Sequence, residues 1–298
     1  DDAGAHFNNF NLRDTLGNTF NLDGDVGMAN PAQPKLDLRL RTDKFQMINS
    51  TFKQNELFYG DLFSSMDLRI SGTARNPVLK GALGILPGTK FSVVLPGSKV
   101  ELVDAQGIVI FTDDLTAIDT LTSASDSEVM RDSLKAQLPG VELDLAISVD
   151  KQAEFAIVLD PTTGDQATFS GSGDLVFRYK PDGEMYLSGP FVVDNGGYTL
   201  EFYGLVKKRF ELVNGSSIRW TGDPIKAAMD IRARYTSESA PFPLVASSST
   251  GIADSERNRL QQPLPFSVII SVGGAVNDPK IDFGIDLDRG LRNSYPQV

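Results

Sequence analysis

Strict alternation of apolar and polar residues is the main pattern along this chain. In residues 35–41, Leu36, Leu38 and Leu40 alternate with charged residues, and similar runs begin near residues 66, 141, 155, 175, 198, 229, 266 and 281. Successive side chains of a β-strand point to opposite faces, so the period of two predicts strands with one apolar and one polar face. Strands of a buried parallel sheet would be apolar on both faces. The pattern therefore favours an antiparallel-rich sheet of about twenty short strands.

Turn-forming residues separate many of these runs. Pro-Gly, Asp-Gly and Asn-Gly pairs supply the positive φ angles of tight hairpin turns. We expect such turns at Leu86-Pro87-Gly88, Leu95-Pro96-Gly97, Pro181-Asp182-Gly183, Asn195-Gly196-Gly197 and Asn214-Gly215. A recurring corner, in which Gly is followed by Asn-Pro or Asp-Pro, is clearest at residues 72–81 and supports one continuous sheet.

Two stretches lack the alternation. Residues 125–138 combine a Ser cap with apolar residues at roughly helical spacing, which predicts a short helix or a flexible insertion. Residues 237–262 are rich in Ser, Pro and charge, and we interpret them as a long loop. The predicted organisation is a β segment at 1–122, an insertion at 123–140, a second β segment at 141–290 and a tail at 291–298.

A sheet with one apolar face has to cover that face. The sequence offers almost no amphipathic helix, so a sandwich, a closed barrel and an elongated curled sheet remain. Twenty strands at ~4.8 Å would extend the sheet by ~95 Å, and a flat open sheet of that size is unusual. We predict an all-β fold, an elongated and curled sheet whose apolar face lines a groove. A filled sandwich core is the alternative, because such faces most often form ordinary cores.

Composition narrows the chemistry. The 298 residues include 28 Lys and Arg, 39 Asp and Glu, one His and no Cys. The absence of Cys excludes disulfides and thiolate chemistry, and the single His6 argues against His-based catalysis. The net charge of −11 argues against a nucleic-acid partner. No apolar run reaches the ~18 residues of a membrane span. Because the chain starts at Asp1 without a signal sequence, we interpret it as a mature or excised piece.

Candidate sites for metals and catalysis have simpler explanations. Asp23 and Asp25, like Asp113 and Asp114, offer oxygen ligands for Ca²⁺, but the EF-hand spacing is absent and turn residues explain them. Carboxylates alternate along exposed strand faces, which argues against a glycosidase pair. The Gly-Ser-Gly at 171–173 lacks the Lys and the helix of a phosphate loop. We therefore expect no catalytic residue, no metal site and no cofactor.

The second half of the chain carries more specific motifs. It contains GDLVFRY at 173–179, MDIRARY at 229–235 and VNDPKIDF at 276–283. The most specific is NGSSIRWTGDP at 214–224, which precedes an alternating strand that ends in Tyr235. From about residue 140 to 288 the chain resembles the C-terminal domain of the TamB translocation-and-assembly-module family, in the style of its Bacteroidetes branch. The residues before 120 match that family only in style.

This resemblance implies a function in the envelope of double-membrane bacteria. Members of the family are anchored in the inner membrane by an N-terminal helix, which is absent from these residues, and they extend across the periplasm. Their β-taco grooves are implicated in moving phospholipid to the outer membrane. The resemblance also implies that the C-terminal end docks on a TamA-type or BamA-type barrel protein of the outer membrane.

The predicted binding surface is a set of apolar strand residues that contact phospholipid acyl chains. It comprises Leu143, Leu145, Ile147, Phe155, Ile157, Leu175, Phe177, Leu200, Phe202, Met229, Ile231, Val268, Ile270, Phe283 and Ile285. Trp220, the only Trp, is expected at the groove rim or in a core. The Lys207-Lys208-Arg209 run is interpreted as solvated edge charge, with contact to anionic headgroups or a partner as the alternative.

The predicted function is therefore a lipid conduit without enzymatic activity. One alternative is a periplasmic scaffold or chaperone, in which an open edge strand pairs with a nascent outer-membrane β-strand. A more distant alternative is a carbohydrate-active β-helix enzyme.

Overall fold

A computed structural model describes residues 4–94, 138–161, 164–202, 206–242, 254–275, 278–287 and 289–294, and it confirms the predicted all-β, curled, antiparallel-rich fold. The described residues form one sheet of fifteen strands. The strands are β1 (Gly4–Arg13), β2 (Thr19–Gly27), β3 (Lys35–Ser50), β4 (Phe58–Thr73), β5 (Pro77–Ile85), β6 (Lys90–Val94), β7 (Glu142–Val149), β8 (Glu154–Asp160), β9 (Asp165–Tyr179), β10 (Met185–Phe202), β11 (Val206–Leu212), β12 (Ser217–Gly222), β13 (Ala228–Ser239), β14 (Leu264–Ala275) and β15 (Asp278–Leu287).

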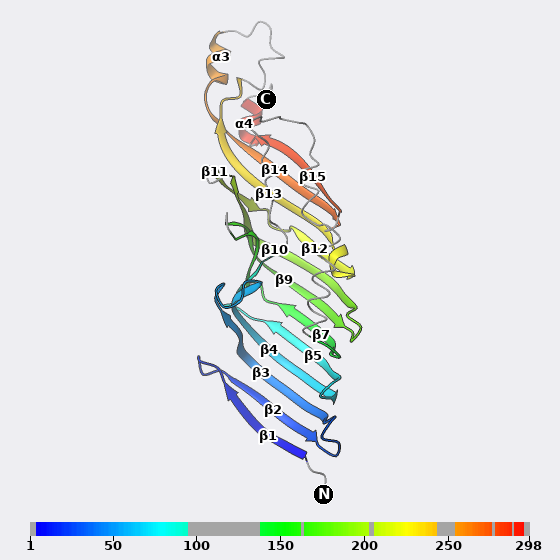
Figure 1. Ribbon diagram of the computed structural model, residues 1–298. Helices are drawn as coiled ribbons and strands as arrows, with labels where there is room; N and C mark the ends of the chain where they lie inside the picture. The colour runs from blue at the N-terminus through cyan, green and yellow to red at the C-terminus, as the bar shows by residue number, and fades with distance from the viewer. Residues whose placement is uncertain are drawn as a thin grey trace, which may run out of the picture.

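The sheet is elongated, and its strands follow one another from one end of the molecule to the other. Figure 1 shows β1 near the N-terminus and β15 near the C-terminus, at opposite ends. Most neighbours are antiparallel, whereas β5 pairs with β7 and β6 with β8 in parallel. Parallel neighbours need a long connection, and residues 86–141 separate β5 from β7 in the sequence.

The sheet bends, and its long strands cross the bend. Strand β4 pairs with β5 through one half and with β6 through the other, and β9 pairs with β7 and β8 in the same way. Strands β10 and β13 likewise share β12 on one side of the bend and β11 on the other. We call the side with β5, β7 and β12 the first arm, and the side with β6, β8 and β11 the second arm.

This bend corrects three of the predicted hairpins. The turns at Leu86-Pro87-Gly88 and Asn214-Gly215 join the two arms, since the strands on either side pair with common neighbours and not with each other. Asn195 to Gly197 lie inside β10, where a register shift between Val193 and Asn195 marks a bulge that bends the strand without reversing it. These turn residues allow a sharp corner. Whether the chain then forms a hairpin or continues into the other arm depends on which strands pair.

The other predicted turns have different outcomes. At Pro181-Asp182-Gly183 the hairpin between β9 and β10 is confirmed, and the Gly183 N–H donates to the Lys180 carbonyl at 2.9 Å. The predicted turn at Leu95-Pro96-Gly97 lies outside the described residues. The described residues contain fifteen strands, whereas about twenty were expected. Part of the difference arises because β10 continues through the corner predicted at Asn195-Gly196-Gly197.

The helices are short and lie partly where a loop was expected. The predicted helix or insertion at 125–138 lies outside the described residues, apart from its last residue. Helix α3 (Asp254–Leu260) occurs within the loop predicted at 237–262, and α4 (Arg289–Ser294) reaches into the predicted tail. A single 3₁₀ turn, η2 (Pro224–Lys226), precedes β13. Leu260 of α3 is fully buried against Leu264, Phe266 and Leu287, so packing stabilises a helix too short to be stable alone.

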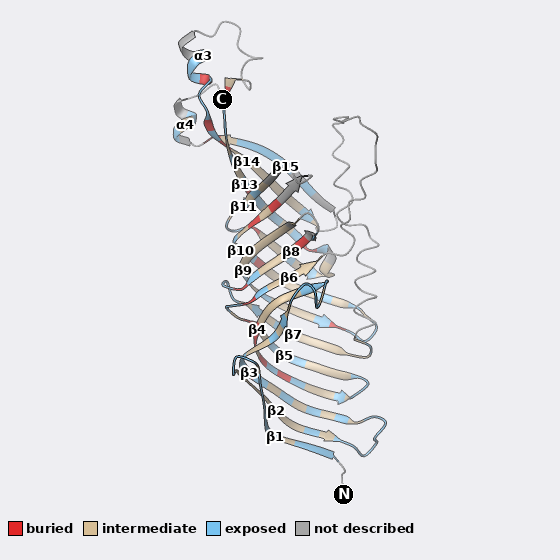
Figure 2. Ribbon diagram, turned by 60° about the vertical axis from the view of Figure 1, so that its left-hand side comes forward, coloured by how far each residue is buried: buried red, intermediate tan, exposed pale blue. Residues whose placement is uncertain are grey.

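Buried side chains gather at the bend and under these helices. Phe63, Ser64, Thr89 and Phe191 are buried and lie where the two arms join. The Thr89 hydroxyl is within hydrogen-bonding distance of the backbone N–H and carbonyl of Phe63, which ties the first corner to β4. Figure 2 shows that most of the remaining sheet is half-buried or exposed. The buried residues therefore lie mainly along the bend and under α3 and α4.

Candidate functional site

Cross-strand register aligns the apolar residues of neighbouring strands. One such row runs through Leu22, Leu40, Leu68, Gly81, Leu145, Phe177 and Leu187. Further rows cross the last three strands, as in the pairing of Ala233 with Ile270 and of Ile270 with Phe283. Directly opposed residues share one side of a sheet. These rows form a single surface from β1 to β15, which we call the apolar face.

All predicted lining residues with described side chains belong to the apolar face. Leu143, Leu145 and Ile147 on β7 oppose Tyr179, Phe177 and Leu175 on β9. In the second arm, Phe155 and Ile157 oppose Phe169 and Ala167. Near the C-terminal end, the face includes Met229, Ile231, Val268, Ile270, Phe283 and Ile285. The side chains of Leu200 and Phe202 lie outside the described residues.

The apolar face is open to solvent. Eleven of these thirteen described side chains are half-buried, and Phe283 and Ile285 are exposed to 60% and 66%. A filled sandwich would bury most of them, because core residues are enclosed on all sides. Apolar area of this extent on a protein surface is typical of a binding surface.

Aromatic contacts show that the apolar face is on the inner side of the bend. The Phe191 ring of β10 lies 6.2 Å from the Phe155 ring and 5.8 Å from the Phe169 ring, although it pairs with Gly173 in the other arm. A Cβ at Gly171 would be 2.9 Å from Phe191 ring atoms. Gly171 and Gly173 thus leave room for this ring, and this explains the Gly-Ser-Gly motif.

The opposite side of the sheet is polar and carries a lattice of ion pairs. Arg39 pairs with Asp67 at 2.7 Å, Arg41 with Asp23 at 3.1 Å, and Arg69 with Asp37 at 3.0 Å. A hollow of about 660 Å³ lies on this side, beside Gly24 and Gly81. Apart from the half-buried Asp23, the paired side chains are exposed, so these ion pairs contribute mainly to solubility and to the separation of two chemically different faces.

This lattice predicts a pH dependence of stability. A hydrogen bond from Arg39 holds the pKa of Asp67 below its ordinary value of 3.8, and a backbone hydrogen bond from Asn9, aided by Arg41, does the same for Asp23. The unfolded carboxyls bind protons first, so this stabilisation is present above about pH 3.8 and is lost as pH falls through the lowered values. Thermal melts should show a weaker acid dependence for Asp67→Asn, and salt should shrink the difference.

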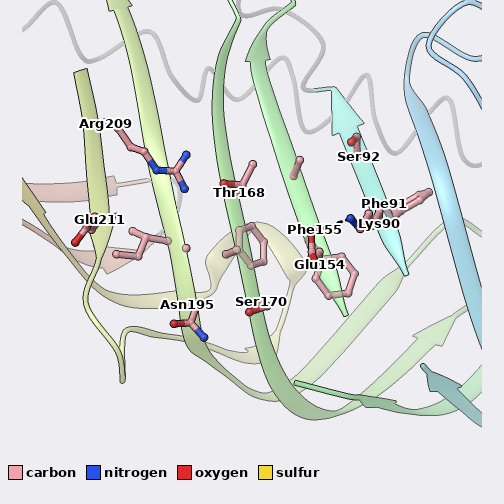
Figure 3. A pocket seen from close by; sticks show the side chains of 14 residues that line it. Lys90, Phe91, Ser92, Glu154, Phe155, Thr168, Ser170, Asn195, Arg209 and Glu211 are labelled. Carbon is pink, nitrogen blue, oxygen red and sulfur yellow. Dashed lines mark ion pairs between the residues drawn. The ribbon is translucent and has the colours of Figure 1, made fainter. Parts of the chain in front are cut away.

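A second hollow, of about 630 Å³, follows the second arm and β10 (Figure 3). Its lining combines the phenylalanines Phe91, Phe155 and Phe169 with charged residues such as Glu154 and Arg209. Lys90 and Glu154 form an ion pair at 3.9 Å. Phe155 is the only predicted lining residue here, so the hollow is a local feature and not the predicted surface.

The remaining candidates have structural roles. Trp220 is half-buried on the apolar face, opposite Gly189, and its indole N–H donates to the Pro224 carbonyl at 3.1 Å. Asp23 pairs with Arg41, and Asp25 lies 2.5 Å from the ring of His6. Asp113 and Asp114 lie outside the described residues. Within the part of the chain that the structure describes, no three His, Cys, Asp or Glu residues group as metal ligands.

Two features were not identified from the sequence. The bend requires the Phe191 cluster and the bulge in β10, and neither follows from a period of two. Lys208 lies on the apolar face, since it opposes Leu200 on β10 and stacks on Tyr235. Alternation through Val206, Lys208, Phe210 and Leu212 contained that signal, but the Lys207-Lys208-Arg209 run was interpreted as edge charge.

Comparison with known families identifies the domain. The family model of the TamB C-terminal domain matches residues 8–296, which is nearly the whole chain. The match therefore includes the first strands, where the sequence motifs are weak. No curated protein matches the chain. Among the described residues, no helix has the length and apolar character needed to cross a membrane.

Proposed function

Since this chain belongs to the TamB family, a non-enzymatic family of the bacterial envelope that serves assembly and transport, we propose that it is a segment of a lipid conduit. Phospholipid acyl chains lie along the apolar face while their headgroups stay in water. The observation that carries this proposal is the cross-strand pairing that aligns mostly apolar residues on one face from β1 to β15, combined with their partial exposure.

The chemistry of the surface suits acyl chains. A methylene group moved from water to an apolar wall gains about 0.8 kcal/mol, so a chain that stays on the wall retains that gain wherever it lies. Rows of aliphatic and aromatic side chains create no deep local minimum for an acyl chain, and movement along the sheet needs no chemical step. Direction and energy would come from other components of the envelope.

Localisation and partners extend the same proposal. The segment would act in the periplasm, as part of a protein anchored in the inner membrane, and would deliver lipid toward a TamA-type or BamA-type outer-membrane barrel. A scaffold for outer-membrane barrel proteins is the competing function within the same family, and it would use the backbone edge of a strand instead of the apolar face.

Lipid capture distinguishes the two functions. The purified chain, stripped of lipid and incubated with phosphatidylcholine vesicles that carry a trace of fluorescent phospholipid, should be recovered with bound phospholipid by mass spectrometry. It should also accelerate exchange between donor and acceptor vesicles. Absence of both signals would contradict the conduit. Crosslinks from β1 to an unfolded barrel substrate, without lipid binding, would favour the scaffold.

A further inference from the structure

One charged side chain lies on the apolar face. Among the strand-paired residues with described side chains, those that share this face are apolar, Gly, Ser, Thr or Tyr, and Lys208 is the exception. Lys208 opposes Leu200, and Phe210 on the same strand opposes Tyr198. The centres of the Phe210 and Tyr235 rings are 5.6 Å apart. The cation is therefore surrounded by the same surface that the proposed acyl chains would use.

Tyr235 of β13 holds this ammonium group in place. The Lys208 Nζ lies 4.6 Å from the centre of the Tyr235 ring and donates to the phenol oxygen at 2.5 Å. This hydrogen bond is the main cause that lowers the pKa of Tyr235, and Ser237 makes a smaller contribution. Tyr235 opposes Val268 and Ser237 opposes Phe266, so both belong to the apolar face.

The ammonium group retains the capacity to bind an anion. It has three N–H donors, and the Tyr235 hydroxyl accepts one of them. Among the described residues, no Asp or Glu forms an ion pair with Lys208, whereas Lys80 and Lys90 on the polar side each face a Glu at 3.9 Å. A half-buried cation beside apolar walls is stabilised by a negative partner, because its own hydration is incomplete.

We propose that Lys208, supported by Tyr235, binds the headgroup of an anionic phospholipid whose acyl chains lie on the adjoining apolar face. The inference rests on the proposed lipid conduit and adds a lipid preference to it. Lys208 is near the start of β11, and the adjacent corner of the face, at Phe266 and Leu287, is covered by α3 and α4. A headgroup at Lys208 would thus be next to the covered corner, with its acyl chains directed along the open part.

The test compares two vesicle compositions. Lipid-free chain is incubated with vesicles of phosphatidylcholine alone or of phosphatidylcholine mixed with phosphatidylglycerol, and bound lipids are quantified by mass spectrometry. We expect phosphatidylglycerol to be enriched about tenfold over its share of the vesicle, the effect of one charge-assisted hydrogen bond. Lys208→Met should abolish this enrichment while phosphatidylcholine uptake persists, and Lys208→Arg should retain it.

The control is Lys80→Met, which removes the same charge from the polar side and should leave the enrichment intact. Lys208→Met places an apolar chain on an apolar surface, so folding should be preserved, as circular dichroism would confirm. Equal binding of both lipids by the unaltered chain, or enrichment that survives Lys208→Met, would overturn this inference and leave the conduit standing. Uptake of neither lipid would overturn both.

Discussion

Ile147→Asp is expected to abolish phospholipid transfer by this chain and to reduce lipid uptake at least about tenfold. Ile147 is on β7, at the middle of the apolar face, where it opposes Leu83 on one side and Leu175 on the other. A carboxylate there would have to lose its water whenever an acyl chain passed. An acyl chain that moves along a conduit has to pass every row of residues in turn. A carboxylate in one row should therefore stop transfer even if the rest of the face still binds lipid.

The neighbouring residue supplies a matched control. Ser148→Asp introduces the same carboxylate one position along β7, but on the polar side, where Ser148 opposes Asp174 and is exposed. Transfer between vesicles should remain near that of the unaltered chain. Fluorescence exchange measured for both variants at equal folded concentration checks the prediction. Both substitutions add one negative charge. If the two variants transfer lipid at the same rate, the apolar face is not the transfer path.

The contrast between these two positions is already present in the sequence. Alternation assigns Ile147 and Ser148 to opposite faces, and the register confirms that the apolar set of one strand meets that of the next. The period therefore predicts the strands, the curled all-β class and the membership of the apolar face. It succeeds because it depends only on the side-chain geometry of a single strand.

The period of two does not predict the bend or the pairing of the strands. Asn214-Gly215 has the composition of a hairpin turn, yet β11 and β12 lie in different arms and share β10 and β13 as neighbours. The local turn chemistry is the same in both arrangements. What differs is whether flanking strands find better partners elsewhere, and this depends on contacts between residues far apart in the chain. Helix α3 was not predicted for the same reason, because Leu260 is buried by residues of other elements, such as Phe266 and Leu287.

Phe191→Ala is expected to cost about 3–5 kcal/mol of unfolding free energy, a large part of the stability of a typical domain. Phe191 is 6% exposed and contacts Phe155 and Phe169 across the bend, with edge-to-face geometry at 85° and 76°. Removal of its ring opens a cavity that the backbones of Gly171 and Gly173 cannot fill. Urea unfolding followed by circular dichroism measures the loss.

Phe283→Ala is the matched control, because it deletes the same ring from the same apolar face at a position that is 60% exposed. The expected change in unfolding free energy is within about 0.5 kcal/mol, because folding removes little of this ring's apolar area from water. A large difference between the two variants would show that the bend holds the arms in place while the open face contributes little to stability. Similar losses would mean that both parts of the face are packed as one core, and an open face would then be the wrong description of this sheet.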